Sequence, residues 1–179
     1  MAQRIYYLLS FVFLFTQIIN GQKANNPPET VKYVDLKKYV GLWYEIAKIP
    51  NKFQSDCARS TTAEYKLKED GKIEVINSCI EADGEKNIAE GIAEVVDKST
   101  NAKLEVSFFS ILGIRPFWGD YWILGLGEDY EYAVIGGPDR KYGWILSKTP
   151  TLPEEKLSRA FDILKSQGYN PERFTKTLQ

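Results

Sequence analysis

Glu69-Asp70-Gly71-Lys72 separates two strand-like runs, residues 58–67 and 72–80. An Asp-Gly pair between such runs is a strong short-range signature of a β-hairpin, because the glycine supplies the positive φ that a tight turn requires. The sequence therefore predicts two antiparallel strands joined at Asp70-Gly71.

The same alternation of strand-like runs and turn residues continues in both directions, at intervals of roughly ten residues. Further strands are predicted over residues 43–49, 87–96, 103–109, 118–125, 130–135 and 141–148. A sheet of this many strands has exposed edges, which closure into a barrel removes. The predicted fold class is all-β, an eight-stranded antiparallel up-and-down β-barrel with room inside for one small ligand.

The segments before the first predicted strand and after the last one have helical patterns. Asp35 can cap a short turn over residues 36–39, and Gly41 then releases the chain into the first strand. After the last strand, Thr151 and Glu154 have the spacing of a capping box, and Pro153 suits a first helical turn. Leu157, Phe161 and Leu164 share one face before Gly168 ends this helix, which we expect to pack on the side of the barrel. Residues 174–177 are expected to add a short strand.

Composition excludes several classes of function. The 179 residues carry a formal net charge of -1 with no basic stripe, which argues against a nucleic-acid partner. The absence of histidine removes the commonest metal ligand and the usual general base at neutral pH. We therefore expect no metal, no cofactor and no catalytic residue.

The N-terminus has the pattern of a secretory signal peptide. Arg4 precedes an apolar run from Tyr6 to Phe15, which is short of the about 20 residues that span a bilayer, so an uncleaved membrane anchor is the less favoured alternative. The predicted organisation is a signal peptide over residues 1–21, a flexible lead-in over 22–33 and one domain over 34–179. In an oxidising compartment, Cys57 and Cys79 are candidates for a disulfide; two buried free thiols are the alternative.

Strand alternation predicts which side chains face the barrel interior. Leu104, Val106 and Phe108 share one face, whereas Lys103 and the other polar residues of that strand share the opposite face. Aromatic residues make up 13% of the chain, and many lie on the predicted strands, where they can either pack the core or line a cavity. Polar residues in the same phase, such as Tyr65 or Asn77, could orient a ligand head group.

Several motifs resemble one known family. Gly41-Leu42-Trp43-Tyr44-Glu45-Ile46 resembles the signature that opens the first strand of lipocalins. The segment before it, residues 34–39, and three later segments, 73–77, 136–140 and 144–150, resemble the branch of bacterial outer-membrane lipocalins and apolipoprotein D. The resemblance covers about residues 34–177, nearly the whole predicted domain.

The resemblance implies a carrier of a small lipophilic ligand, with fatty acids and lysophospholipids expected, in membrane lipid maintenance or transport. Together with the alternation, it gives eight expected ligand-binding residues: Tyr65, Val75, Asn77, Val106, Phe108, Tyr121, Tyr132 and Trp144. Three further residues are expected to have structural roles at the closed end of the barrel: Gly41, Trp43 and Lys148. In the family, the first-strand tryptophan, here Trp43, packs against a basic residue at the end of the last strand, here Lys148. Most relatives carry arginine at that position, so the planar group that stacks on an indole is lost here.

The resemblance also bears on location and partners. Bacterial outer-membrane relatives carry a lipid-anchor cysteine directly after the signal peptide, whereas this sequence has no cysteine before Cys57. We expect a secreted or periplasmic protein that is soluble after cleavage, either a monomer or a weak dimer. The apolar run from Ile111 to Phe117 is expected either to contact a membrane or partner, or to form a folded lid or packing contact.

Two other functions compete with a carrier. A lipocalin-like enzyme, such as an isomerase or de-epoxidase, would need a pair of titratable groups inside the barrel. Glu45 and Glu64 are the only acidic candidates, and we expect both at the rim or surface. A filled barrel without a cavity, serving as a structural or interaction protein, is the other alternative.

Overall fold

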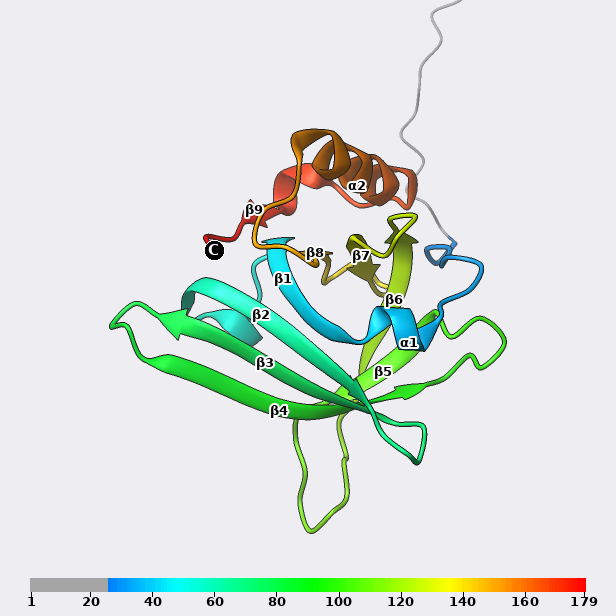
Figure 1. The fold of residues 1–179 in the computed structure, drawn as a ribbon, viewed down its shortest axis with the longest axis vertical. Helices are drawn as coiled ribbons and strands as arrows, with labels where there is room; N and C mark the ends of the chain where they lie inside the picture. Colours follow the sequence, from blue (N-terminus) through cyan, green and yellow to red (C-terminus); the bar gives the residue numbers. More distant parts are fainter. Residues whose placement is uncertain (1–25) are drawn as a thin grey trace, which may run out of the picture.

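The computed structural model describes residues 26–179, whose arrangement is shown in Figure 1. The signal peptide predicted over residues 1–21, and residues 22–25 of the predicted lead-in, lie outside the described residues. Residues 26–33 form no helix or strand, but they do not hang free. The Val31 amide donates to the Ile123 carbonyl (2.9 Å), and Arg140 donates to the Asn26 carbonyl (2.7 Å), so this part of the predicted lead-in contacts the barrel.

One antiparallel sheet makes up the described domain and closes on itself. Its strands are β1 (Gly41–Lys48), β2 (Cys57–Leu67), β3 (Ile73–Glu81), β4 (Lys86–Val95), β5 (Lys103–Ser107), β6 (Gly119–Leu126), β7 (Tyr132–Gly136), β8 (Trp144–Ser147) and the two-residue β9 (Thr175–Lys176). Each of β1 to β8 pairs with its neighbours along the chain, and β1 pairs with both β8 and β2. The predicted eight-stranded up-and-down barrel is confirmed.

The seam between β1 and β2 is only partly a strand ladder. Residues 41–44 pair with residues 65–62, and beyond Tyr44↔Thr62 the two strands separate. The C-terminal segment enters this gap: β9 pairs with Ala47 and Lys48 of β1, and the Ser60 amide donates to the Leu178 carbonyl (2.6 Å). The predicted short strand near the C-terminus therefore exists and completes the wall of the barrel.

Local signals explain most of the turns and caps. At the predicted hairpin, Gly71 adopts a φ of 83°, and the Lys68 amide donates to the Lys72 carbonyl. Asp35 caps helix α1 (Leu36–Tyr39) by accepting from the Lys37 amide (2.9 Å). Both features follow directly from the residue types at these positions.

Helix α2 (Glu154–Ser166) lies on the side of the barrel, as predicted (Figure 1). The predicted capping box is wrong, because the helix begins at Glu154 and its N-cap position is Pro153, with no side-chain cap bond. Proline disfavours helical backbone at the residue before it, here Leu152, which would have to be the first helical residue if Thr151 were the N-cap. Short 3-10 turns, η1 (Lys52–Gln54) and η2 (Pro171–Arg173), complete the described elements.

Several strand limits also differ from the predictions, and β5 and β8 are shortened the most. β5 ends at Ser107 rather than at residue 109, and β8 spans only Trp144–Ser147 instead of residues 141–148. Lys141 lies in the loop before β8, where its carbonyl accepts a hydrogen bond from Arg173 (3.1 Å) instead of joining the ladder. The start of β8 is therefore set by long-range contacts with the C-terminal segment, which cannot be predicted from the local sequence.

Candidate functional site

A cavity of about 740 Å³ lies inside the barrel. Its walls are mainly apolar and aromatic, and it is bounded at one end by side chains from three loops: the segment around η1, the β5–β6 loop and the β7–β8 loop. Its lining includes Phe53, Ala63, Tyr65, Ile73, Val75, Asn77, Ala89, Ala93, Leu104, Val106, Phe108, Tyr121, Tyr142, Trp144 and Leu146. The alternative of a filled barrel is therefore wrong for this fold.

Three tyrosine hydroxyls meet at the inner end of the cavity. The Tyr121 hydroxyl shares one hydrogen bond with that of Tyr39 (2.6 Å) and another with that of Tyr65 (3.0 Å). Burial raises the pKa of Tyr65 to about 12, and burial also raises the pKa of Tyr39 and Tyr121 well above the ordinary range. The tyrosine triad, Tyr39, Tyr65 and Tyr121, is thus neutral at physiological pH and forms a polar floor in an otherwise apolar cavity.

Beneath this floor, Trp43 and Lys148 close the barrel. Trp43 is fully buried, packs 5.1 Å from the Tyr39 ring centroid and donates its indole N–H to the Tyr39 carbonyl (2.7 Å). The Lys148 ammonium lies 4.1 Å from the Trp43 ring centroid and donates to the carbonyls of Tyr39 (3.2 Å) and Val40 (2.8 Å). The predicted pairing of Trp43 with Lys148 is present, and burial lowers the pKa of Lys148 to about 8.

Gly41 sits beside this pair at the start of β1. It adopts a φ of 100°, a conformation that residues with a side chain rarely occupy, and a Cβ placed here would lie 3.6 Å from the Lys148 ammonium. The glycine therefore allows the sharp entry from α1 into β1.

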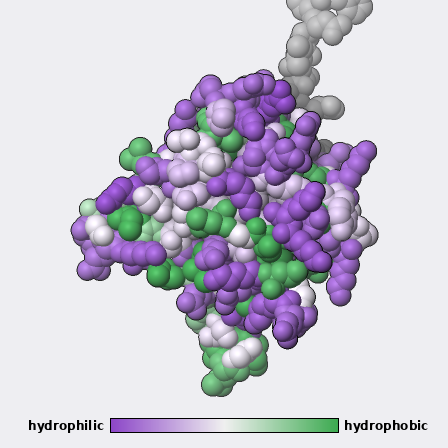
Figure 2. Space-filling view, viewed as in Figure 1, coloured by the Kyte–Doolittle hydropathy of each residue, from purple (hydrophilic) through white to green (hydrophobic). Residues whose placement is uncertain are grey.

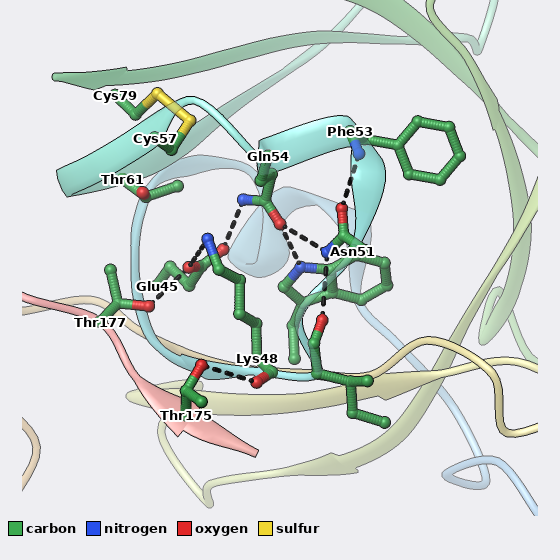
Figure 3. A network of polar contacts seen from close by, with 12 residues as sticks. Glu45, Lys48, Asn51, Phe53, Gln54, Cys57, Thr61, Cys79, Thr175 and Thr177 are labelled. Atoms are coloured by element: carbon green, nitrogen blue, oxygen red, sulfur yellow. Dashed lines mark hydrogen bonds and ion pairs between the residues drawn. A yellow bond between two sulfur atoms is a disulfide. The ribbon is translucent and has the colours of Figure 1, made fainter. Parts of the chain in front are cut away.

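Glu45 also lines the cavity, at the seam between β1 and β2. Figure 3 shows its polar network. Its side chain is almost fully buried; it accepts from Gln54 Nε2 (2.6 Å) and Thr177 Oγ1 (2.5 Å) and pairs with the Lys48 ammonium (3.2 Å). Gln54 in turn accepts from the Trp144 indole N–H (3.0 Å). The network ties the η1 segment and the C-terminus to the barrel wall.

Our expectation that Glu45 lies at the rim or surface is wrong. The residue follows Trp43 by two positions on the same strand face, and this spacing could have placed it inside. Glu64 does lie on the surface, where its half-exposed side chain pairs with Lys66 (3.4 Å). The two carboxylates therefore do not converge on one site.

The predicted disulfide is present between Cys57 and Cys79, with an S–S distance of 2.00 Å. It joins the start of β2 to β3, close to the Glu45 network in Figure 3. The bond therefore ties the start of β2, the strand that follows the η1 segment, to β3.

The mouth of the cavity carries exposed apolar side chains. The β5–β6 loop projects from the barrel between the ends of these strands (Figure 1), and its tip is hydrophobic in Figure 2. Leu112, 97% exposed, is at the tip, and Ile114 and Phe117 are also exposed. The mutual backbone hydrogen bonds of Ile111 and Ile114, both 2.9 Å, give this tip a defined hairpin shape.

Comparison with known families matches residues 34–179 to the lipocalin-like domain. The chain belongs to the lipocalins. This match covers every described strand and helix, including the cavity, the tyrosine triad and the Trp43–Lys148 pair.

Curated relatives and solved structures agree with this membership. The lipocalin is 38% identical over 174 residues to outer membrane lipoprotein Blc of Vibrio cholerae, covering 94% of this chain and 97% of that protein. It is 37% identical over 192 residues to apolipoprotein D of Mus musculus, covering 100% and 96%. The crystal structure of insecticyanin from Manduca sexta superposes with a TM-score of 0.68 at 28% identity, covering 84% of this chain and 83% of that one.

Seven of the eight ligand-binding residues expected for this lipocalin line the cavity: Tyr65, Val75, Asn77, Val106, Phe108, Tyr121 and Trp144. Tyr132 does not, because it is buried between the barrel and α2 with Leu157 and Leu164. Every residue of β7 is buried, so alternation along this strand carries no signal of which side faces inward. The inward residues are Ala133 and Ile135, which belong to the inner core.

Proposed function

We propose that this lipocalin is a carrier that binds a small lipophilic molecule in its barrel, with a fatty acid or a lysophospholipid as the ligand and membrane lipid maintenance or transport as the role. The observation that carries the proposal is the apolar cavity of about 740 Å³ bounded at one end by loops. Ligand pockets for small molecules typically have about 300–1,000 Å³ and mostly apolar walls with a few placed polar groups. An acyl chain suits this volume and these walls.

The location that we propose is the periplasm or the outside of the cell. The apolar run from Tyr6 to Phe15 has the pattern of a signal peptide, and the Cys57–Cys79 disulfide is of the kind that persists in oxidising compartments. None of the helices within residues 26–179 is long and apolar enough to span a bilayer.

Native mass spectrometry of the protein expressed without residues 1–21, followed by denaturing extraction and lipid analysis, tests the carrier function. A co-purifying lipid class at near-stoichiometric occupancy is the expected result. A protein that carries nothing, and that takes up neither added fatty acid nor added lysophospholipid, would contradict it.

We also propose that the exposed tip of the β5–β6 loop contacts a membrane surface. Leu112 has a φ of 50°, a conformation that favours glycine or asparagine, and its side chain packs on nothing in the fold. Because neither local conformation nor packing calls for leucine there, an apolar partner outside the chain explains it better than a lid or an internal contact does. The mouth of the cavity would then face the lipids from which a ligand is taken.

The alternative of an enzyme acting on a hydrophobic substrate has less support. The general acid and base of such an enzyme must converge on one substrate, and Glu45 and Glu64 lie on opposite faces of the barrel wall. Turnover of a bound substrate that is abolished by Glu45→Gln would favour the enzyme.

A further inference from the structure

Thr61 places a hydroxyl without a partner on the cavity wall. Among the described residues, its Oγ1 is the single buried side-chain polar atom with no hydrogen bond, although only 5% of the residue is exposed. Thr61 lines the cavity together with Glu45. A buried polar group without a partner costs free energy, so natural folds rarely keep one without a role.

Glu45 and Thr61 are neighbours across the seam. The last paired residues of the ladder are Tyr44 and Thr62, so Glu45 and Thr61 occupy the next opposed positions. The Gln179 side-chain amide bridges their two carbonyls, donating to Glu45 (2.6 Å) and to Thr61 (2.9 Å). Both residues line the same cavity, and Figure 3 shows Thr61 beside the group around Glu45.

The remaining hydrogen-bonding capacity of this pair defines the group that would fit there. A carboxylate offers about four acceptor positions. Lys48 and Thr177 occupy Oε1 of Glu45, and Gln54 occupies Oε2, which leaves one position on Oε2. Thr61 Oγ1 can donate one proton. A group that accepts from Thr61 and donates to Glu45 would satisfy both atoms, and an uncharged hydroxyl does both.

Charge argues against an anion at the same place. The charged side chains that line the cavity are Glu45, Lys52, Asp120 and Asp139, three carboxylates and one ammonium. Lys48 already forms an ion pair with Glu45. A ligand carboxylate beside Glu45 would therefore face a like charge in a poorly solvated wall, which is unfavourable.

We propose that Thr61 and Glu45 form a subsite for an uncharged hydroxyl group of the lipophilic ligand, which the cavity selects over a carboxylate at this position. The proposal rests on the carrier function above; of the two ligands named there, it favours a lysophospholipid, whose glycerol carries an uncharged hydroxyl, over a fatty acid. In this proposal, the wall at the β1–β2 seam recognises the polar group of the ligand. A long-chain alcohol should therefore bind more tightly than the acid of the same chain length.

Displacement of a hydrophobic fluorescent probe by tetradecanol and by tetradecanoate, at about pH 8 where the acid is ionised, tests the subsite. Tetradecanol should bind roughly tenfold more tightly than tetradecanoate in the natural protein. Thr61→Val keeps the shape of the side chain and removes the hydroxyl, so it should weaken tetradecanol by roughly fivefold and leave tetradecanoate unchanged. Its thermal midpoint should equal or exceed that of the natural protein, because the substitution removes an unpaired buried group.

Thr62→Val is the matched control, since the Thr62 hydroxyl already shares a hydrogen bond with Ser78 (2.9 Å). It should not change the ratio of the two affinities. Equal or reversed affinities for alcohol and acid, or a ratio that Thr61→Val leaves unchanged, would overturn the subsite while the carrier function stands. Binding of neither compound would overturn the subsite, and if added lysophospholipid is not taken up either, the carrier function falls with it.

Discussion

The Lys148 ammonium lies over the Trp43 indole, 4.1 Å from the ring centroid, and donates to two carbonyls of the segment that leads into β1. The contact joins the end of β8 to the start of β1. It lies on the far side of the tyrosine triad from the cavity. A lysine here keeps the charge and the cation–π contact, although it lacks the planar group of arginine. The pair therefore closes the barrel without taking part in the cavity.

Replacing Lys148 by alanine should lower the free energy of unfolding by about 1–3 kcal/mol, because two backbone acceptors and the indole face lose their partner. Lys148→Arg should retain most of the stability. Lys103→Ala is a matched control, since its ammonium also lies over an indole, 4.3 Å from the Trp122 ring centroid, but donates to no carbonyl of residues 26–179; it should cost less than about 1 kcal/mol. Urea unfolding followed by tryptophan fluorescence measures all three. Equal costs for the two alanine variants would contradict a special role for Lys148.

Stability should depend on alkaline pH in two opposing stages. Burial lowers the pKa of Lys148 to about 8, so between about pH 8 and 10 the unfolded chain holds a proton that the folded protein has lost, and stability should rise with pH. Above about pH 10 the tyrosines of the unfolded chain ionise, whereas burial keeps the pKa of Tyr65 at about 12, so stability should fall. Urea midpoints measured across this range give both slopes. Lys148→Met should abolish the rise and keep the fall.

Tyr121→Phe tests the tyrosine triad separately. The substitution removes the hydroxyl that bonds both Tyr39 and Tyr65, and it leaves two buried hydroxyls without their observed partner. We expect a loss of about 1–3 kcal/mol and a shallower fall of stability above about pH 10. Tyr142→Phe serves as control, because Tyr142 lies at the mouth of the cavity and its hydroxyl takes no part in the triad. A variant as stable as the natural protein would show that the triad does not stabilise the fold.

The sequence predicts the strands well where local chemistry sets them. Asp70-Gly71 and Asp35 act through their own backbone and side chains, so the hairpin and the first cap could be foreseen. Thr151 and Glu154 have an equally local pattern, yet the intervening Pro153 overrides it.

The interior of the barrel is harder to predict, because it depends on strand register. The triad brings together residues from α1, β2 and β6, and no spacing along the chain relates them. Tyr132 was misplaced because its strand is apolar on both faces. The unpaired hydroxyl of Thr61 cannot be predicted from the sequence, since only the folded structure determines which threonine lacks a hydrogen-bond partner.

The Cys57–Cys79 disulfide should stabilise the domain by about 3 kcal/mol, given a sequence separation of 22 residues. The Cys57→Ala, Cys79→Ala double variant should lose that amount, and a reductant should destabilise the natural protein to the same extent. The double variant is its own control, because reductant should not change its urea midpoint. A reductant that leaves the natural protein unaffected would contradict the expected contribution.

The apolar tip of the β5–β6 loop should bind lipid vesicles. Leu112→Asp and Ile114→Asp each replace an exposed apolar side chain, and burying such a side chain contributes about 1.5–3 kcal/mol, so together they should reduce vesicle binding by more than about tenfold. Flotation with phosphatidylcholine vesicles measures binding, and the thermal midpoint should stay unchanged because neither side chain is buried. Val96→Asp is the matched control, because Val96 is an exposed apolar residue in the β4–β5 turn, away from the loops at the mouth. If the control weakens binding as much as the tip variants do, or if no variant changes it, the β5–β6 loop is not the surface that meets the membrane.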